Sequence, residues 1–198
     1  MPALHRTHNR ANMYGLARHA EHYDRWAGAL SRPLYRRVVT DVAAASLPTR
    51  AVVLDVGTGP GRVPWLIAEK CPQLSVTGID LSPEMIARAT DQNRVGRDGD
   101  VQVSFQVADV VELPFEDGSV DLVVSSISMH HWEDPAAGLR DVVRVLRPGA
   151  EAWIYDVRPM IRRGAQAGAE LDADVRVECP LSGTLWLNPI GRLILRRH

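Results

Sequence analysis

The chain has 198 residues, with 23 Lys and Arg against 24 Asp and Glu, which gives a formal net charge of -1 at pH 7. Its 45% hydrophobic and 24% charged residues are globular values, and they exclude a disordered or fibrous chain. A net charge so close to zero argues against a protein whose main partner is nucleic-acid phosphate or an anionic membrane.

The N-terminal part of the chain, residues 14–45, shows the spacing of apolar residues that is typical of a helix. We expect two helical pieces, because Pro33 interrupts the pattern. Residues 1–48 are predicted to be a helical lid segment and residues 49–198 the core of one single domain. Tyr14 and Tyr23 lie in the lid segment, where a polar-tipped aromatic side chain either closes over a ligand or packs on the core.

From residue 51 onward, strand-like and helix-like stretches alternate. Strands are predicted over 51–56, 75–79, 101–107, 120–125 and 152–155, and helices over 62–70, 83–90 and 135–146. A helix over 161–174 and two strands over 175–178 and 192–196 follow, and the two strands pair antiparallel because no helix separates them. This order predicts an α/β fold, Rossmann-like and doubly wound, with a mainly parallel sheet and an antiparallel C-terminal strand pair.

The strongest chemical signal is the glycine-rich turn between the first strand and the first helix of the core. It reads Leu54-Asp-Val-Gly-Thr-Gly-Pro-Gly61, and glycines there let the backbone approach a ligand closely, so that a side chain at Gly57 would occupy the ligand's space. A dinucleotide fingerprint requires its third glycine at the position of Arg62. The turn carries a carboxylate instead, Asp55, which attracts an ammonium group and repels a pyrophosphate.

Acidic residues also end the next two predicted strands. Asp80 lies about 20 residues beyond the glycine turn, where a carboxylate accepts hydrogen bonds from both hydroxyls of a ribose. Asp109 ends the third strand, where its side chain and backbone can meet an adenine edge. Each acid alone is more often a helix cap or a solvated residue. Because ligands bind in the crevice at the carboxyl ends of parallel strands, three acids in succession predict a nucleoside site.

Several stretches together are similar to the class I S-adenosylmethionine-dependent methyltransferases, particularly the small-molecule branch related to the ubiquinone/menaquinone biosynthesis methyltransferases. They are 53–61, 76–86, Ala108-Asp109 with 113–121, His130-His131-Trp132, and Arg144-Val-Leu-Arg-Pro-Gly149. The resemblance spans about residues 23–156. It implies that S-adenosyl-L-methionine is the methyl donor and S-adenosyl-L-homocysteine the product.

The resemblance also implies which residues contact the cofactor. The residues matching those that hold the methionine part are Asp55, Gly57, Thr58, Gly59 and Gly61. The residues expected at the ribose and the adenine are Asp80, Leu81, Met85, Ala108, Asp109 and Val110, and those that pass the sulfonium are Ser125 and Ser126.

Methyl transfer requires that nucleophile, methyl group and sulfur be aligned, and that a proton be removed from some acceptors. His131 and His130 follow the fourth strand and are the candidate catalytic bases. A structural role for the pair, holding its loop by hydrogen bonds, is the alternative.

No metal site is expected. The N-terminal histidines have no acid or cysteine at ligand spacing; they are His5, His8, His19 and His22. Cys71 and Cys179 stand far apart, so neither a zinc site nor a disulfide framework is indicated. The polar, basic N-terminus is not a secretory signal, and a cytoplasmic location is expected.

The predicted function is methyl transfer to a small-molecule acceptor by direct displacement at the sulfonium methyl. A non-catalytic protein that binds the cofactor, or a regulatory one, stays open as the alternative because no base is decided. Methylation of RNA or protein is disfavoured by the net charge and by the lack of a basic, aromatic groove pattern. We therefore expect neither nucleic acid nor membrane as partner, and the sequence leaves the acceptor atom and the oligomeric state open.

Overall fold

The computed structural model describes residues 20–91, 102–179 and 189–198 of the chain. It forms two compact units, Met1–Leu34 and Tyr35–His198. The second unit contains all the strands found in the described residues, and it begins 14 residues before the predicted core, within the segment predicted as a lid. Tyr14 and the side chain of Tyr23 lie outside the described residues, so their closing over a ligand stays a prediction.

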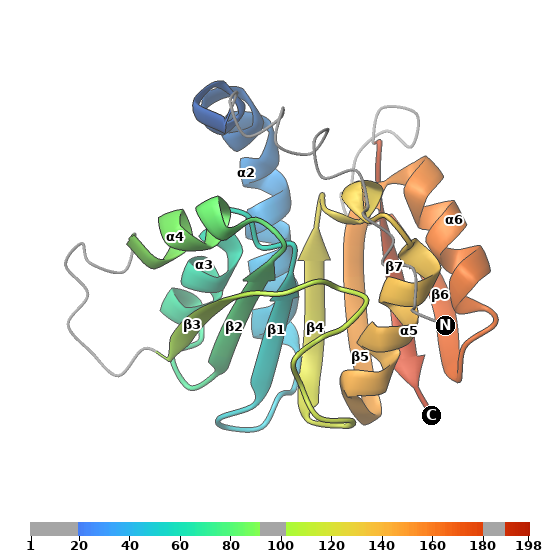
Figure 1. Cartoon of the computed structure of the whole chain (residues 1–198). Coiled ribbons are helices and arrows are strands. Elements are labelled where there is room, and N and C mark those ends of the chain that lie inside the picture. Colours follow the sequence, from blue (N-terminus) through green and yellow to red (C-terminus); the bar gives the residue numbers. More distant parts are fainter. Residues whose placement is uncertain (1–19, 92–101, 180–188) are drawn as a thin grey trace, which may run out of the picture. The chain divides into compact units, whose positions relative to one another are not determined.

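The core of the second unit is a seven-stranded sheet with strand order β3-β2-β1-β4-β5-β7-β6 (Figure 1). The strands are β1 (Val52–Val56), β2 (Ser75–Asp80), β3 (Val103–Val107), β4 (Val120–Ser126), β5 (Leu146–Val157), β6 (Ala173–Glu178) and β7 (Ile190–Arg197). The first five strands pair in parallel, and β7 pairs antiparallel with both β5 and β6. This confirms the predicted Rossmann-like sheet with its antiparallel C-terminal pair.

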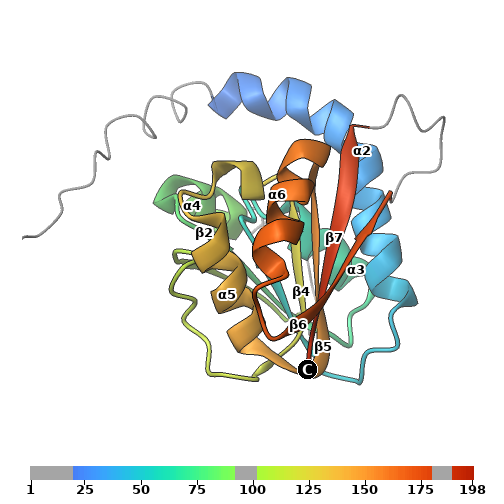
Figure 2. The same cartoon turned by 90° about the vertical axis from the view of Figure 1, so that its right-hand side faces the viewer.

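Helices cover both faces of the sheet. They are α2 (Ala20–Ala44), α3 (Arg62–Lys70), α4 (Pro83–Asp91), α5 (Pro135–Val145) and α6 (Arg158–Gly168), with a short 3-10 turn η2 (Met129–His131). Helices α5 and α6 lie on one face, and α3 lies on the other with the part of α2 that belongs to the second unit (Figure 2). None of the described helices is long and apolar enough to cross a membrane.

Two predicted helices differ from the structure. Helix α2 runs through Pro33 without the predicted break; the loss of one backbone hydrogen bond at a proline does not end this helix, whose later residues Val38 and Val42 are buried. The tail helix was predicted over 161–174, but α6 begins at Arg158 and ends at Gly168. A Cβ on Gly168 would lie 2.8 Å from Leu195 Cδ2 of β7, so this glycine permits close packing of the helix end on the sheet.

The part of α2 in the second unit is fixed to the sheet by polar contacts. The Tyr155 hydroxyl donates to Asp41 Oδ2 at 2.7 Å, and Arg192 pairs with the same oxygen at 2.7 Å. Arg192 also pairs with Glu178 of β6. Asp41 and Arg192 each have side chains only 12% exposed, so these charges are partnered as buried charges must be. Residues 35–44 are therefore part of the core structure.

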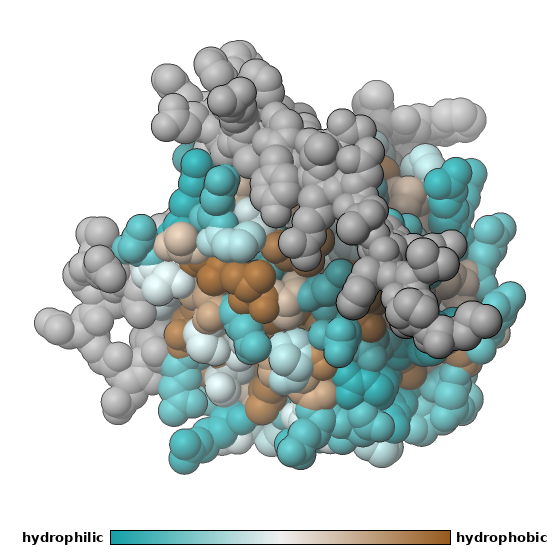
Figure 3. All heavy atoms as spheres, viewed as in Figure 1, coloured by the Kyte–Doolittle hydropathy of each residue, from teal (hydrophilic) through white to brown (hydrophobic). Residues whose placement is uncertain are grey.

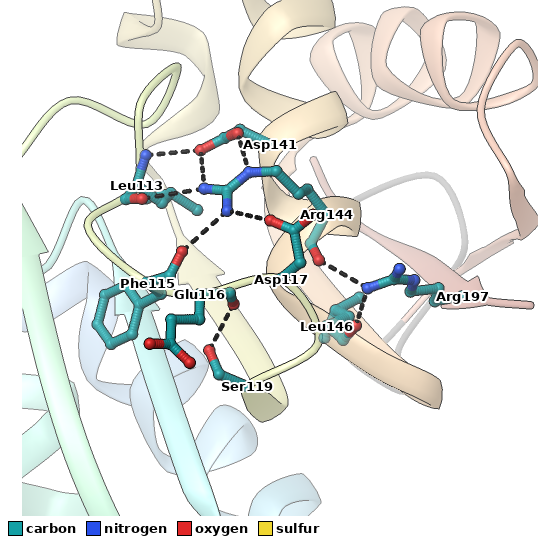
Figure 4. Close-up of polar contacts among 9 residues, drawn as sticks. All are labelled: Leu113, Phe115, Glu116, Asp117, Ser119, Asp141, Arg144, Leu146 and Arg197. Carbon is teal, nitrogen blue, oxygen red and sulfur yellow. Dashed lines mark hydrogen bonds and ion pairs between the residues drawn. The ribbon is translucent and has the colours of Figure 1, made fainter.

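A second polar cluster fixes the loop that leads into β4 (Figure 4). The Arg144 guanidinium donates to the Leu113 and Phe115 carbonyls at 3.0 and 2.8 Å, and also to Asp117 and Asp141. The Asp141 carboxylate in turn accepts from the Leu113 amide at 2.6 Å. Five hydrogen bonds to four partners use the fixed fork of donors that only arginine has, and they hold residues 113–117 in one conformation.

The strand order reverses between β1 and β4, because β1 pairs with β2 on one side and with β4 on the other. In open parallel sheets, ligands bind outside the carboxyl ends of the strands at this switch point. The loop after β1 and the residues after β4 therefore lie at the place where a ligand is expected.

Candidate active site

The glycine loop after β1 follows a left-handed path. The φ angles of Gly57 and Gly59 are +71° and +54°, a region that side chains disfavour. The Gly57 and Thr58 amides both donate to the Ile79 carbonyl, at 2.9 and 2.8 Å, and so tie the loop to β2. A Cβ on Gly59 would meet no atom within 4 Å. The loop thus presents open space at Gly59, as a ligand-binding turn requires.

The structure gives a further steric reason for glycine at position 57. A Cβ at this position would lie 1.7 Å from Ser128 Oγ and 2.5 Å from Ser128 Cβ. The space that a side chain would need is therefore filled by Ser128, which follows β4, and the contact of Gly57 with a ligand stays a prediction.

Asp80 is held by the backbone around it. Its Oδ2 accepts from the Gly59 amide at 2.8 Å and its Oδ1 from the Ser82 amide at 2.9 Å. Ser82 caps α4 as predicted, since its hydroxyl accepts from the Met85 amide at 3.3 Å. Each carboxylate oxygen has a second lone pair, so the fixed carboxylate can still accept two hydrogen bonds.

Asp55 is buried without a partner. Only 1% of the residue is exposed, and neither carboxylate oxygen has a hydrogen-bond partner among the described residues. Burial raises the pKa of Asp55 to about 7; the Thr58 hydroxyl opposes this rise and the negative charge of Asp80 adds to it. Thr58 Oγ1 itself is buried and makes no hydrogen bond of ordinary geometry. Unpartnered buried groups of this kind are rare and call for an explanation.

Exposed apolar side chains lie at or just beyond the ends of β2 and β3. Leu81, Val107 and Val111 are 46%, 45% and 40% exposed. Figure 3 shows hydrophobic residues gathered in the middle of the face that Figure 1 presents. The predicted adenine residue Asp109 lies in this segment and is exposed, and its Oδ1 accepts from the Val111 amide at 3.1 Å. Its neighbour Val110 is 9% exposed, so its side chain packs inward.

The two histidines of η2 differ in their surroundings. His130 Nδ1 lies 2.9 Å from Asp156 Oδ1 and 3.1 Å from Asp156 Oδ2, and the His130 amide donates to the same carboxylate at 3.1 Å. Asp156 is fully buried at the end of β5. A carboxylate accepts only, so the proton of a neutral His130 lies on Nδ1 and its Nε2 carries a free lone pair.

Among the described residues, no carboxylate forms a comparable pair with His131. Its ring centroid lies 3.9 Å from that of His130. Desolvation lowers the pKa of His131 and the adjacent His130 adds to this, against the smaller influence of Asp156 and Asp80. The geometry thus favours His130 over His131 as the candidate base, and it adds Asp156 as a candidate partner, which sequence reasoning missed.

The end of β4 supplies the remaining predicted residues. Ser125 is 1% exposed and its buried hydroxyl has no hydrogen-bond partner in the described parts of the chain, whereas Ser126 is half-buried. Asp55 is in register with Val124 on β4, and Asp80 with Val107 on β3. The parallel register brings Asp55, Asp80 and the β4 end to one edge of the sheet. Within the described parts of the chain, no three His, Cys, Asp or Glu side chains form a group that could hold a metal ion; the four N-terminal histidines lie outside the residues whose side chains are described.

A family model described as a methyltransferase domain matches residues 54–154, which is half of the chain and includes the glycine loop, Asp80 and both histidines. The chain belongs to the class I S-adenosylmethionine-dependent methyltransferase family. The family resemblance predicted from the sequence is confirmed.

Relatives of this methyltransferase domain include two bacterial proteins. The 27-O-demethylrifamycin SV methyltransferase of Amycolatopsis mediterranei is 34% identical over 164 residues, which are 82% of this chain and 58% of that protein. The demethylmenaquinone methyltransferase of Thermus thermophilus is 32% identical over 125 residues, which are 63% of this chain and 54% of that protein. The chain thus spans a little over half the length of these two relatives.

The fold agrees with solved structures. A SAM-dependent methyltransferase from Aquifex aeolicus superposes with a TM-score of 0.64 at 21% identity, covering 82% of this chain and 88% of that one. At this identity the similarity shows the fold alone, and it confirms the Rossmann-like methyltransferase architecture.

Proposed function

We propose that this domain transfers the methyl group of S-adenosylmethionine to a small organic acceptor that carries a removable proton. The observation that carries the proposal is Asp55, a buried carboxylate with no hydrogen-bond partner among the described residues, which lies at the end of β1 just before the glycine loop. An ammonium group, such as that of the methionine part, would supply the missing partner and favour the charged carboxylate. A pyrophosphate there would be repelled.

The other residues of the edge fit the remaining parts of the same ligand. Asp80 would accept from the ribose hydroxyls with the lone pairs that the Gly59 and Ser82 amides leave free. Leu81, Val107 and Val111 offer exposed apolar surface for the adenine ring. When bound, S-adenosylmethionine supplies a methyl group on a positively charged sulfur, which is a good leaving group.

His130 is the general base of this proposal. With its proton on Nδ1 toward Asp156, its Nε2 can take the proton of an acceptor hydroxyl or acidic carbon. The electron pair freed on the acceptor forms the new bond to the methyl carbon. The carbon–sulfur bond breaks and its pair stays on sulfur, so that the proton ends on His130 and the charges balance.

The relatives support the proposed acceptor class. Their names give 27-O-demethylrifamycin SV and demethylmenaquinone as substrates, which are small organic molecules. We therefore infer a small-molecule acceptor for this domain in preference to RNA or protein.

The proposal is tested by following S-adenosylhomocysteine formation with purified protein, S-adenosylmethionine and a fractionated metabolite extract. We expect product in at least one fraction with wild-type protein and none above background with His130→Gln. Binding of the cofactor without product in any fraction would favour the non-catalytic alternative. The surface variant Asp172→Asn, with a side chain 84% exposed, is the matched control and should behave as wild type.

A further inference from the structure

One short segment touches both halves of the site. Residues 127–132 follow β4 and include η2, which carries His130 and His131. At its start, Ser128 fills the space beside Gly57 of the glycine loop. Two residues later, His130 is bound to Asp156 through its amide and its ring. The segment therefore joins the loop proposed to hold the cofactor to the residue proposed as the base.

Ser128 is fixed in this segment from several sides. It is 8% exposed, and its hydroxyl accepts from Trp132 Nε1 at 3.0 Å. Its carbonyl accepts from the His131 amide at 2.9 Å, which closes the turn that carries the histidines. A displacement of Ser128 would therefore be passed to η2 through a backbone hydrogen bond and through the chain itself.

The residue before Ser128 is in a strained conformation. Ile127 has a φ of 52°, in the left-handed region that a β-branched side chain disfavours. Its amide donates to the Tyr155 carbonyl at 2.7 Å, which anchors it to β5 next to Asp156. Such strain persists only where the surroundings determine the conformation, and it is common at functional sites.

We propose that Ser128 is a positioning residue that sets His130 relative to the glycine loop. In this proposal, which rests on the proposed function, Gly57 lacks a side chain so that Ser128 can lie against the loop. Through this contact, the position of the glycine loop determines the position of His130. A side chain at position 57 would push Ser128, and through it would move His130 away from Asp156.

The test uses a steric pair and a matched control. Gly57→Ala places a Cβ where Ser128 lies, and Ser128→Gly removes the two atoms that would clash with it, leaving Ser128 Cα at a normal contact distance of 3.8 Å. Gly149→Ala is the control, because Gly149 has a φ of +80° and nothing within 4 Å of its Cβ. It carries the same left-handed backbone strain without a clash, and it lies outside the site.

We expect Gly57→Ala to lower the midpoint of thermal unfolding by about 5 °C more than Gly149→Ala does, as an overpacked site should. The double variant Gly57→Ala/Ser128→Gly should recover most of this difference. Ser128→Ala should restore less than Ser128→Gly does, because its Cβ would still lie 2.5 Å from the new one. If Gly57→Ala does not fold, a folded double variant supports the proposal and an unfolded one contradicts it.

The NMR signal of the His130 ring distinguishes a positioning role of Ser128 from a merely structural one. Long-range nitrogen–proton correlation on histidine-labelled protein, assigned by the signal lost in His130→Gln, should show His130 with its proton on Nδ1. Gly57→Ala should shift or broaden this signal, and the double variant should return it to its wild-type position. An unchanged His130 signal in folded Gly57→Ala would overturn the proposal.

These experiments separate the inference from the proposed function. They observe packing and the histidine ring without any acceptor or cofactor. If S-adenosylhomocysteine did not bind to the wild-type protein, the proposed function would fail, while the dependence of His130 on residues 57 and 128 would still be measured.

Discussion

Asp55 is the residue whose environment makes the sharpest prediction. Its pKa is raised to about 7 by burial, so the partnerless carboxyl is mostly neutral at pH 5.5 and mostly charged at pH 7.5. If the charged form binds the ligand's ammonium group, S-adenosylhomocysteine should bind about 20-fold more tightly at pH 7.5 than at pH 5.5. Calorimetric titration at the two values measures this, and Asp55→Asn should show a much smaller change.

The same carboxyl affects stability with the opposite sign. A folded-state pKa above the unfolded value means that the fold favours the neutral acid. The free energy of unfolding should therefore fall as pH rises from about 4 to about 7. Urea unfolding of wild type and Asp55→Asn across this range checks the sign. If the free energy of unfolding changed equally with pH in the two proteins, Asp55 would ionise in the fold as it does in water.

The two histidines give the second prediction at this scale. His130→Gln should lower turnover by about 100- to 10,000-fold, the range for loss of a general base, and His131→Gln should lower it much less. Asp156→Asn should lower turnover as well. The carboxylate only accepts, whereas the side-chain amide of the variant can also donate, so the proton of His130 is no longer fixed on Nδ1. Rates are compared at saturating cofactor once an acceptor fraction is found. A larger loss for His131→Gln than for His130→Gln would reverse the assignment.

At the scale of single elements, Arg144 of α5 makes a prediction about loop stability. Its guanidinium holds two carbonyls and two carboxylates of the loop and of its own helix (Figure 4). Arg144→Met should lower the free energy of unfolding by about 1–3 kcal/mol. This figure is smaller than the sum of the lost hydrogen bonds, because the Arg144 side chain is partly exposed to solvent. Asp117→Asn removes the charge of only one partner, whose side chain is 71% exposed, and should change the free energy of unfolding by less than about 1 kcal/mol. Urea titration distinguishes the two.

Elements with strong local signals could be predicted from the sequence. Helix α3 begins and ends where predicted, because the glycine loop precedes it and Pro72 follows it. The tail helix could not be placed, because the packing of Gly168 against Leu195 of a later strand decides its end. Propensity alone does not contain that contact.

Some residues of the candidate site could likewise be predicted from the sequence and others could not. The acids Asp55 and Asp80 were identified because they lie at the ends of two consecutive predicted strands. Asp156 was missed, because it is 26 residues from His130 and only the pairing of β4 with β5 brings them together. The signal available was an acid at the end of the predicted fifth strand, the same position that identified Asp80. Ser128 carried no signal, since its role depends on contact with Gly57.

At the scale of the whole molecule, the division of the chain into two units predicts how many N-terminal residues can be removed without loss of the fold. A chain beginning at Tyr35 should fold, because it is the complete second unit. A chain beginning at Arg50 should not, because it also lacks Val38, Val42 and Asp41. Burial of the two valines alone stabilises by about 3–6 kcal/mol, a large part of a typical total of about 5–15 kcal/mol. Circular dichroism and thermal unfolding of the two chains test this, and a cooperative transition in the shorter one would refute it.

The central claim, that the edge of the sheet at β1, β2 and β4 binds S-adenosylmethionine, is tested most directly by calorimetric titration with S-adenosylhomocysteine. The account predicts saturable binding at sub-millimolar concentration with one ligand per chain. Asp80→Asn, which keeps the shape but loses charge and one acceptor, should bind about tenfold more weakly or worse, and Asp172→Asn should bind as wild type does. Absence of binding by folded wild-type protein, or equal affinity in Asp80→Asn, would contradict the account.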